Sequence, residues 1–130
     1  MAVIVGTFRV PVEIGDPEGR RWETVEAVVD TGASYTVIPR PVLERLGVQA
    51  SFRWPFVLAD GRQVEYEMAE TRVRLDGNTH TTLIVFREES AVPLLGAYTL
   101  EGFRLAPDPV GRRLIPVPGL LTVVRRPDLV

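Results

Sequence analysis

The sequence has 130 residues, of which 45% are hydrophobic and 25% charged, a composition typical of a folded globular protein. A chain of this length buries one hydrophobic core, so we expect a single domain that spans residues 1–130. The formal net charge of −2 leaves no basic surplus for nucleic acid, and the lack of lysine and cysteine removes Schiff-base and thiol chemistry.

No signal for a membrane is found along the chain. No run approaches the ~18 consecutive apolar residues that a membrane-spanning helix needs. The first ten residues lack the basic segment and the long apolar run of a signal peptide. We therefore expect a cytoplasmic protein that does not contact membranes.

The first part of the chain predicts a hairpin followed by a short helix. Apolar and polar residues alternate with the period of half-buried strands over 8–14 and 22–29. Between them, Asp16-Pro17-Glu18-Gly19 predicts a turn, because proline presets φ and glycine tolerates positive φ. Residues 41–46 predict a helix with proline in its first turn and Gly47 as its end.

The middle of the chain predicts two further hairpins, each around an Asp-Gly pair. Asp60-Gly61 is typical of a two-residue hairpin turn, and Asp76-Gly77-Asn78 gives a similar signal. The flanking strands are expected over 56–58 and 64–68, and over 72–75 and 82–86. His80 falls in an expected loop, and a lone histidine is a poor metal ligand, so we expect no metal and no other cofactor.

The last part of the chain predicts less regular structure. A short helix is expected over 97–101, and the prolines between 107 and 118 are expected to interrupt regular structure in that segment. The apolar run 120–124 predicts a final strand, and Val3-Ile4-Val5 is a similar candidate at the other end. Both are candidates for exposed sheet edges.

Asp30 is the candidate functional residue. In Val28-Val29-Asp30-Thr31-Gly32-Ala33-Ser34, an acid stands at the end of a predicted buried strand. A carboxylate followed by Thr-Gly also fits a plain turn in which it accepts backbone N–H groups, so the tripeptide alone leaves both roles open. A weak twofold echo joins this segment to Val92-Pro93-Leu94-Leu95-Gly96, since both are apolar runs that precede a helix.

The sequence resembles the retropepsin-like aspartic proteases in three places that keep that family's order. These are the Asp-Thr-Gly segment at 28–33, the hairpin around Asp60-Gly61 where the family has its flap, and Leu94-Leu95-Gly96. The resemblance implies an all-β, closed barrel of hairpins with one or two short helices. Because the chain has a single Asp-Thr-Gly, it also implies a homodimer in which each copy supplies one catalytic Asp30.

The resemblance further implies roles for neighbouring residues. Thr31 would brace the two loops across the twofold axis, Gly32 would allow close approach to the carboxylates, and Ala33 and Ser34 would shape the pocket wall. The flap candidates are Leu58, Ala59, Asp60, Gly61 and Arg62, with Asp60 and Arg62 where retroviral members are glycine-rich. The terminal strands would interleave in the dimer. Ala33, where many pepsin-like sites have serine, predicts an optimum in mild acid.

The predicted function is an aspartic endopeptidase that hydrolyses peptide bonds of a protein or peptide substrate by general acid–base activation of water. The alternative is a catalytically weak or inactive dimeric module of the same fold that binds or scaffolds peptides. A third possibility is a monomeric all-β domain without a site.

Overall fold

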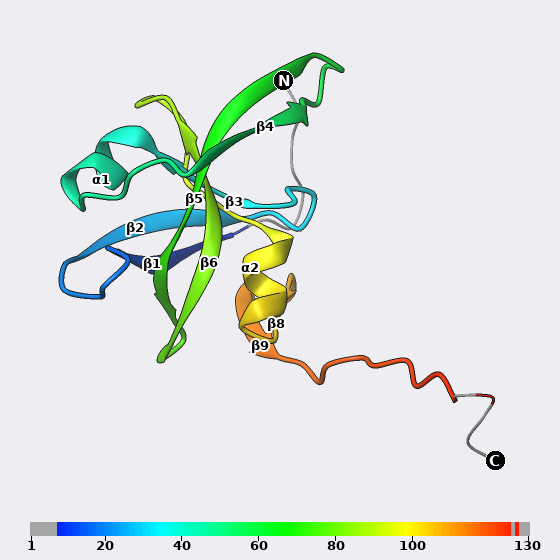
Figure 1. Ribbon diagram of the computed structural model, residues 1–130. Helices are drawn as coiled ribbons and strands as arrows, with labels where there is room; N and C mark the ends of the chain where they lie inside the picture. The colour runs from blue at the N-terminus through cyan, green and yellow to red at the C-terminus, as the bar shows by residue number, and fades with distance from the viewer. Residues whose placement is uncertain (1–7, 126, 128–130) are drawn as a thin grey trace.

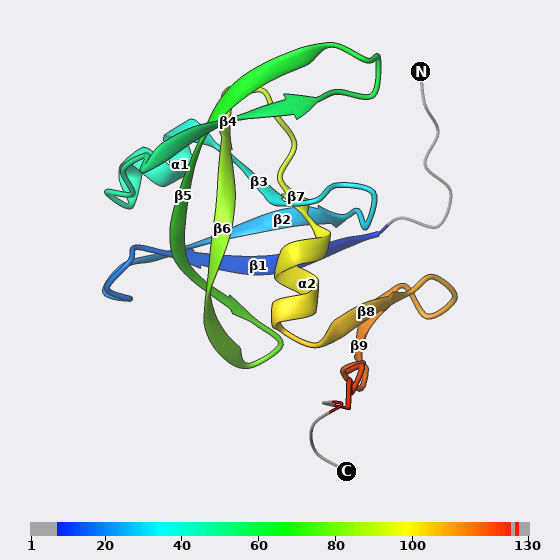
Figure 2. The ribbon, with the colours of Figure 1, turned by 45° about the vertical axis from the view of Figure 1, so that its right-hand side comes forward.

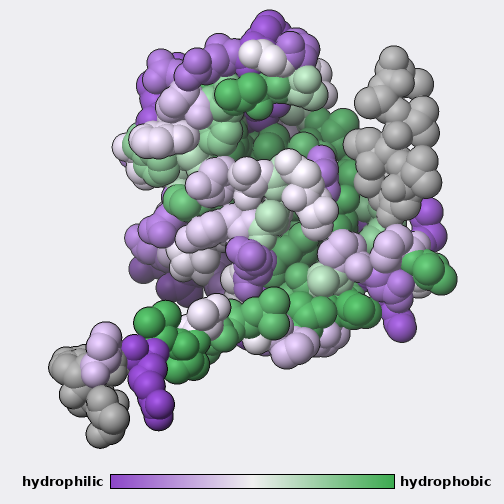
Figure 3. Space-filling model, turned by 90° about the vertical axis from the view of Figure 1, so that its right-hand side faces the viewer, coloured by the Kyte–Doolittle hydropathy of each residue, from purple (hydrophilic) through white to green (hydrophobic). Residues whose placement is uncertain are grey.

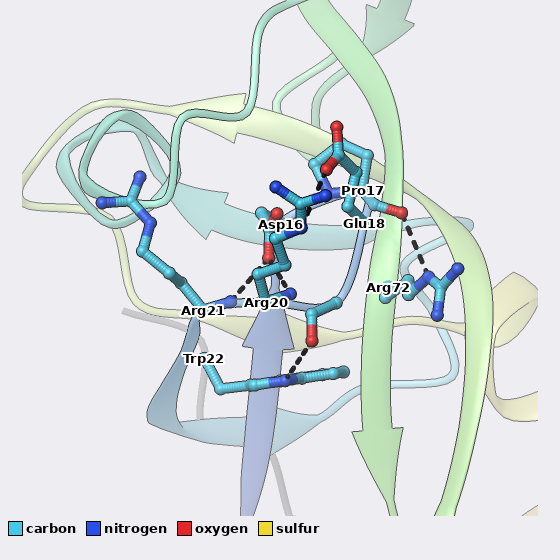
Figure 4. A network of polar contacts seen from close by, with 8 residues as sticks. Asp16, Pro17, Glu18, Arg20, Arg21, Trp22 and Arg72 are labelled. Carbon is cyan, nitrogen blue, oxygen red and sulfur yellow. Dashed lines mark hydrogen bonds and ion pairs between the residues drawn. The ribbon is translucent and has the colours of Figure 1, made fainter.

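The computed structural model describes residues 8–125 and residue 127. The first hairpin, β1 (Arg9–Gly15) and β2 (Trp22–Val29), is antiparallel as predicted. In its turn, Oδ1 of Asp16 accepts the backbone N–H groups of Arg20 and Arg21 at 2.7 Å each, which lowers the Asp16 pKa (Figure 4). The Trp22 indole N–H donates to the Gly19 carbonyl at 3.1 Å (Figure 4). Local hydrogen bonds thus fix the predicted turn.

After β2 the chain forms β3 (Thr36–Pro39), which was not predicted, and then α1 (Arg40–Arg45), which begins one residue before its expected start. A proline lies in the first turn of α1, as expected. The strand β3 takes its hydrogen bonds from distant segments, in parallel with β6 and antiparallel to β7. Its existence therefore depends on tertiary contacts that a local pattern does not contain.

The second hairpin joins β4 (Phe52–Val57) to β5 (Gln63–Leu75). Its turn is not the predicted two-residue turn. The N–H of Leu58 donates to the carbonyl of Arg62 at 2.8 Å, which encloses a three-residue loop, and Gly61 has φ +87°. Three-residue hairpin loops place a glycine with positive φ in this position. β5 also joins the predicted strands 64–68 and 72–75 into one, since no glycine or proline separates them.

The third hairpin joins β5 to β6 (Asn78–Arg87), which is longer than predicted. Asp76 and Gly77 both have positive φ, of 53° and 79°, so this turn does contain two residues. His80 was expected in a loop, but it lies in β6 opposite Val73.

The end of the described chain contains β7 (Leu94–Leu95), α2 (Ala97–Gly102), β8 (Leu105–Asp108) and β9 (Arg113–Pro116). The expectation that prolines interrupt this region was wrong for β8 and β9, which form a two-stranded sheet. In a two-stranded sheet each strand has a free edge, and an edge tolerates a residue without an N–H.

The predicted final strand was also wrong, because residues 120–124 have no regular secondary structure. A strand needs a partner for its backbone groups, and these residues have none among the described residues. The other predicted terminal strand, Val3-Ile4-Val5, lies outside the described residues.

Seven strands form one sheet in the order β1-β2-β7-β3-β6-β5-β4, and β1 also pairs with β5. This extra pairing closes six strands into a barrel and leaves β4 beside β5 as a projecting hairpin (Figure 1). The closed barrel with two short helices confirms the predicted fold. Its core includes Val12, Ile14, Ile38, Leu43, Ile84 and Leu95. No helix among the described residues is long and apolar enough to cross a membrane.

Candidate active site

Asp30 directly follows β2, a strand that is hydrogen-bonded on both sides. β1 pairs with β2 in antiparallel fashion, and β7 pairs with it in parallel, with Val28 opposite Leu94. The backbone N–H of Asp30 donates to the carbonyl oxygen of Leu95 at 3.1 Å. The two apolar segments of the sequence echo are thus neighbours, and together they fix the backbone that carries the Asp30 carboxylate.

The turn from Asp30 to Ser34 folds back on the Asp30 carboxylate. Oδ1 accepts the N–H of Gly32 at 2.9 Å, and the carbonyl oxygen of Asp30 accepts the N–H of Ala33 at 3.2 Å. A Cβ at Gly32 would lie only 3.1 Å from Oδ1, so glycine lets the turn close over the carboxylate. Oδ2 accepts no hydrogen bond from the residues that the structure describes.

The first turn of α2 holds this turn from the other side. The N–H groups of Ala97 and Tyr98 donate to the carbonyl oxygens of Ala33 and Ser34, both at 2.9 Å. Here backbone hydrogen bonds hold α2 against the turn.

Three buried threonine hydroxyls connect α2 to the barrel. The Thr99 hydroxyl lies 2.6 Å from that of Thr36 and 2.9 Å from that of Thr82, and Thr36 Oγ1 accepts the N–H of Gly96 at 3.1 Å. Sequence reasoning missed these residues, since threonine is common in exposed strands and its presence does not indicate burial. None of the three lines the cavity beside Asp30, so their role is to position the loops.

A cavity of about 380 Å³ lies between the Asp30 turn and the β4–β5 hairpin, whose tip projects on the same side of the molecule (Figure 2). Among the residues that the structure describes, Asp30 is the only acidic one in its lining. Six of the predicted site residues line it, namely Asp30, Gly32, Ala33, Ser34, Leu58 and Ala59. Thr31 and the tip residues Asp60, Gly61 and Arg62 are exposed and do not line it.

The family model described as aspartyl protease matches residues 10–99, which is more than half of the chain. The chain belongs to the aspartyl protease family. No curated protein sequence matches it. Two similar solved structures support this aspartyl protease's retropepsin-like fold. The EIAV protease complexed with the inhibitor HBY-793 has a TM-score of 0.54 and 18% identity, over 73% of this chain and 86% of that chain. The solution structure of the simian foamy virus (mac) protease has a TM-score of 0.53 and 16% identity, over 73% and 93%.

In this aspartyl protease, aromatic rings connect the projecting hairpin to the Asp30 turn. The ring centroids of Tyr35 and Phe56 are 6.1 Å apart in an edge-to-face arrangement, and those of Phe56 and Tyr66 are 6.0 Å apart. Tyr98 of α2 adds a third pair, 5.6 Å from Tyr35. Sequence reasoning missed Tyr35, Phe56 and Tyr66 as site residues. The two-residue alternation along the hairpin, which places Phe56 and Tyr66 on one face, was the available signal.

An arginine at the cavity rim of this aspartyl protease is already neutralised. The guanidinium carbon of Arg87 lies 4.6 Å from the centre of the Tyr66 ring. The Arg87 side chain donates to both carboxylate oxygens of Glu88, at 3.0 and 2.9 Å, and these bonds lower the Glu88 pKa to about 2. The rest of the wall includes Val37, Val85 and Leu94. The cavity therefore offers one carboxylate beside a mainly apolar and aromatic wall.

Proposed function

We propose that this chain is an aspartic endopeptidase that hydrolyses peptide bonds as a homodimer, with Asp30 of each copy as one of two catalytic carboxylates. The observation that carries the proposal is the single acid in the cavity lining of an aspartyl protease family member. Amide hydrolysis needs a base that activates water and an acid that assists the carbonyl and the leaving nitrogen. Because each chain contributes one acid to the described cavity lining, the second acid has to come from another copy.

In this dimer, one Asp30 carboxylate takes a proton from a water molecule as the water oxygen attacks the peptide carbonyl carbon. The Asp30 carboxyl of the second copy gives its proton to the carbonyl oxygen. The tetrahedral intermediate then expels the nitrogen, which receives a proton from the first Asp30 carboxyl group as the C–N bond breaks, while one hydroxyl of the intermediate gives its proton to the Asp30 carboxylate of the second copy. Two carboxyl groups that act on one substrate carbonyl lie side by side. They share one proton, because two adjacent negative charges are costly, and they titrate as a pair.

The residues of the turn have supporting roles in this proposal. Thr31 is exposed beside Asp30, which supports a contact with the second copy. Gly32 donates its N–H to the Asp30 carboxylate, while Ala33 and Ser34 form part of the cavity wall that contacts the substrate.

The β4–β5 hairpin is the proposed flap. Leu58 and Ala59 line the cavity, and Asp60, Gly61 and Arg62 form the tip. Arg62 donates its backbone N–H and its side-chain Nε to the Asp60 carboxylate, at 3.0 and 2.7 Å, so the tip has its own order without a glycine-rich stretch. An extended peptide held between this hairpin and the Asp30 turn would be shielded from water.

The segment 120–124 is the proposed contact between the two copies. Leu120, Leu121, Val123 and Val124 are 95%, 93%, 90% and 83% exposed. Figure 3 shows hydrophobic residues, in green, along the chain that leads to the grey end at lower left. Exposed apolar residues with unpaired backbone groups favour addition to a strand of another chain.

The experiment compares wild type with Asp30→Asn on a mixed peptide library between about pH 4 and pH 7, with the mass of each protein measured in solution. Asp76→Asn is the matched control, because Asp76 is exposed in the distant β5–β6 turn. We expect dimeric wild type and Asp76→Asn to cut the same peptides, and dimeric Asp30→Asn to be at least about 100-fold slower.

Two outcomes would contradict the proposal. Cleavage by Asp30→Asn at the wild-type rate would exclude Asp30 as a catalytic residue. A dimer that binds peptides but cuts none would support the alternative, a peptide-binding module. One observation favours this alternative: the aromatic contact between the hairpin and the Asp30 turn restrains the proposed flap.

A further inference from the structure

A second hollow, of about 470 Å³, lies beside the Asp30 strand and differs in chemistry from the first. It is lined by Phe8, Arg9, Val28 and Arg112. Two of these four residues carry a guanidinium group and none carries a carboxylate. The described lining of the first cavity, by contrast, contains one arginine, Arg87, whose guanidinium group is hydrogen-bonded to Glu88.

The second hollow adjoins the proposed catalytic residue. Val28 lies in β2 two positions before Asp30, which directly follows the strand. Arg9 pairs with Val28 across the β1–β2 ladder, so the side chains of Arg9 and Val28 lie on the same face of the sheet. In the sheet, β2 lies between β1 and β7. The first cavity is lined by Leu94 of β7 and the second by Arg9 of β1, so the two lie on opposite sides of β2. The two hollows therefore flank the end of β2 that carries Asp30.

The two arginines of the second hollow are not neutralised within the described residues. Neither Arg9 nor Arg112 forms an ion pair with any acidic side chain that the structure describes. Glu26 lies on the same face of β2, but Arg9 forms no ion pair with it. Because the chain is acidic overall, two uncompensated cations in one hollow are a local excess of positive charge.

Arg112 reaches this hollow from the turn of the β8–β9 hairpin, which lies on the side where β1 begins (Figure 2). Its φ is +52°, an unfavourable value for a residue with a side chain. The preceding turn is fixed by Asp108, whose Oδ1 accepts the N–H groups of Val110 and Gly111 at 3.1 Å each. A strained arginine held at the edge of a hollow supports a function for its side chain.

We propose that Arg9 and Arg112 bind the carboxylate of an acidic side chain in the substrate, and so select peptides with Glu or Asp close to the cleaved bond. This inference rests on the proposed endopeptidase function. Guanidinium groups bind carboxylates with paired, charge-assisted hydrogen bonds. Val28, which lines the hollow, is two positions from Asp30, and an extended peptide advances roughly 3.4 Å per residue as a strand does. We therefore expect the acidic residue within about two residues of the cleaved bond.

The experiment uses a peptide that wild type cuts, in which a single Glu is moved through the positions on either side of the cleaved bond. Each peptide is compared with its Gln counterpart. At one position we expect kcat/KM to be about tenfold higher for Glu than for Gln, and this ratio to fall with added salt. In Arg9→Gln/Arg112→Gln we expect this ratio to become about one, because no guanidinium group remains to bind the Glu carboxylate.

Arg20→Gln is the matched control, because Arg20 is an exposed arginine of the distant β1–β2 turn, and it should keep the full Glu preference. A parallel measurement of peptide binding to Asp30→Asn separates this inference from the endopeptidase proposal, since a Glu preference in binding can be seen without cleavage.

Three results would overturn the inference. Wild type that shows no Glu preference at any position, in cleavage or in binding, has no such subsite. A double variant that becomes monomeric and loses activity on both peptides would mean that the arginines hold a carboxylate of the second copy instead. If wild type cuts and binds no peptide of the mixed library, the endopeptidase proposal and this inference both fail.

Discussion

A methyl group on Gly96 would lie 2.4 Å from both the carbonyl carbon and the carbonyl oxygen of Tyr35. The Tyr35 atoms belong to the backbone, and the position of a Cβ is fixed by its own backbone, so no side-chain rotation relieves the contact. We expect Gly96→Ala to lower the free energy of unfolding by about 3 kcal/mol or more, at the upper end for overpacking. Denaturant unfolding measures the change. Gly102→Ala, where no atom lies within 4 Å of the added methyl group, should not destabilise the protein.

The segments that contain these two glycines were predicted from the sequence, but only Gly96 is packed against another segment. The helix over 97–101 was predicted from local residues, as was the turn after Asp30. The approach of Gly96 to Tyr35 joins two segments far apart in the chain, and its closeness depends on how β3, β7 and α2 pack. A local pattern cannot contain that information.

The two Asp-Gly hairpins also show that a local pattern does not determine every turn. Asp76-Gly77 forms the two-residue turn that the dipeptide predicts, with both residues at positive φ. In Asp60-Gly61 only the glycine has positive φ, and the loop contains three residues. The dipeptide permits both turns, and the pairing of β4 with β5 selects between them.

In the candidate site, motif residues such as Asp30 were predictable from the sequence. Phe56 was not, because its role depends on the position of the hairpin over the Asp30 turn.

Phe56 is the residue that connects the hairpin to the Asp30 turn, since its ring pairs with both Tyr35 and Tyr66. Aromatic pairs contribute about 0.5–1.5 kcal/mol each beyond burial. We therefore expect Phe56→Ala to speed hydrogen exchange of the β4 and β5 amides near the tip by about tenfold or more. Trp54→Ala is the control on the same face of β4, because Trp54 is 58% exposed and forms no aromatic pair among the described residues. Equal protection in the two variants would contradict the role of Phe56.

The Arg87–Glu88 pair should affect stability only over a defined range of pH. The Glu88 pKa is lowered from 4.5 to about 2, so the folded state favours the charged carboxylate. The stabilisation is therefore complete above about pH 5 and is lost as the pH falls toward 2. Glu88 is an exposed partner, with 54% of its side chain accessible, so the contribution is at most about 1 kcal/mol.

Thermal unfolding of wild type and Glu88→Gln at a series of pH values tests this. The Tm difference should be largest near neutral pH and should disappear toward pH 2. A difference that is the same at every pH would mean that Glu88 acts through its shape rather than its charge. Glu89→Gln, an exposed neighbour that forms no ion pair among the described residues, is the control and should show no such trend.

Ala33 lines the cavity beside Asp30, and its side chain cannot donate a hydrogen bond. A serine hydroxyl at this position would be able to donate to the Asp30 carboxylate, and such a bond favours the charged form of a carboxyl group. The charged form of the carboxylate pair would then persist at lower pH, so Ala33→Ser should shift the acidic limb of the kcat/KM profile downward by roughly half to one pH unit. Ala91→Ser, which changes an alanine outside the cavity lining, should leave the profile in place. If the two variants gave the same acidic limb as wild type, the alanine at position 33 would not set the pH range of this site.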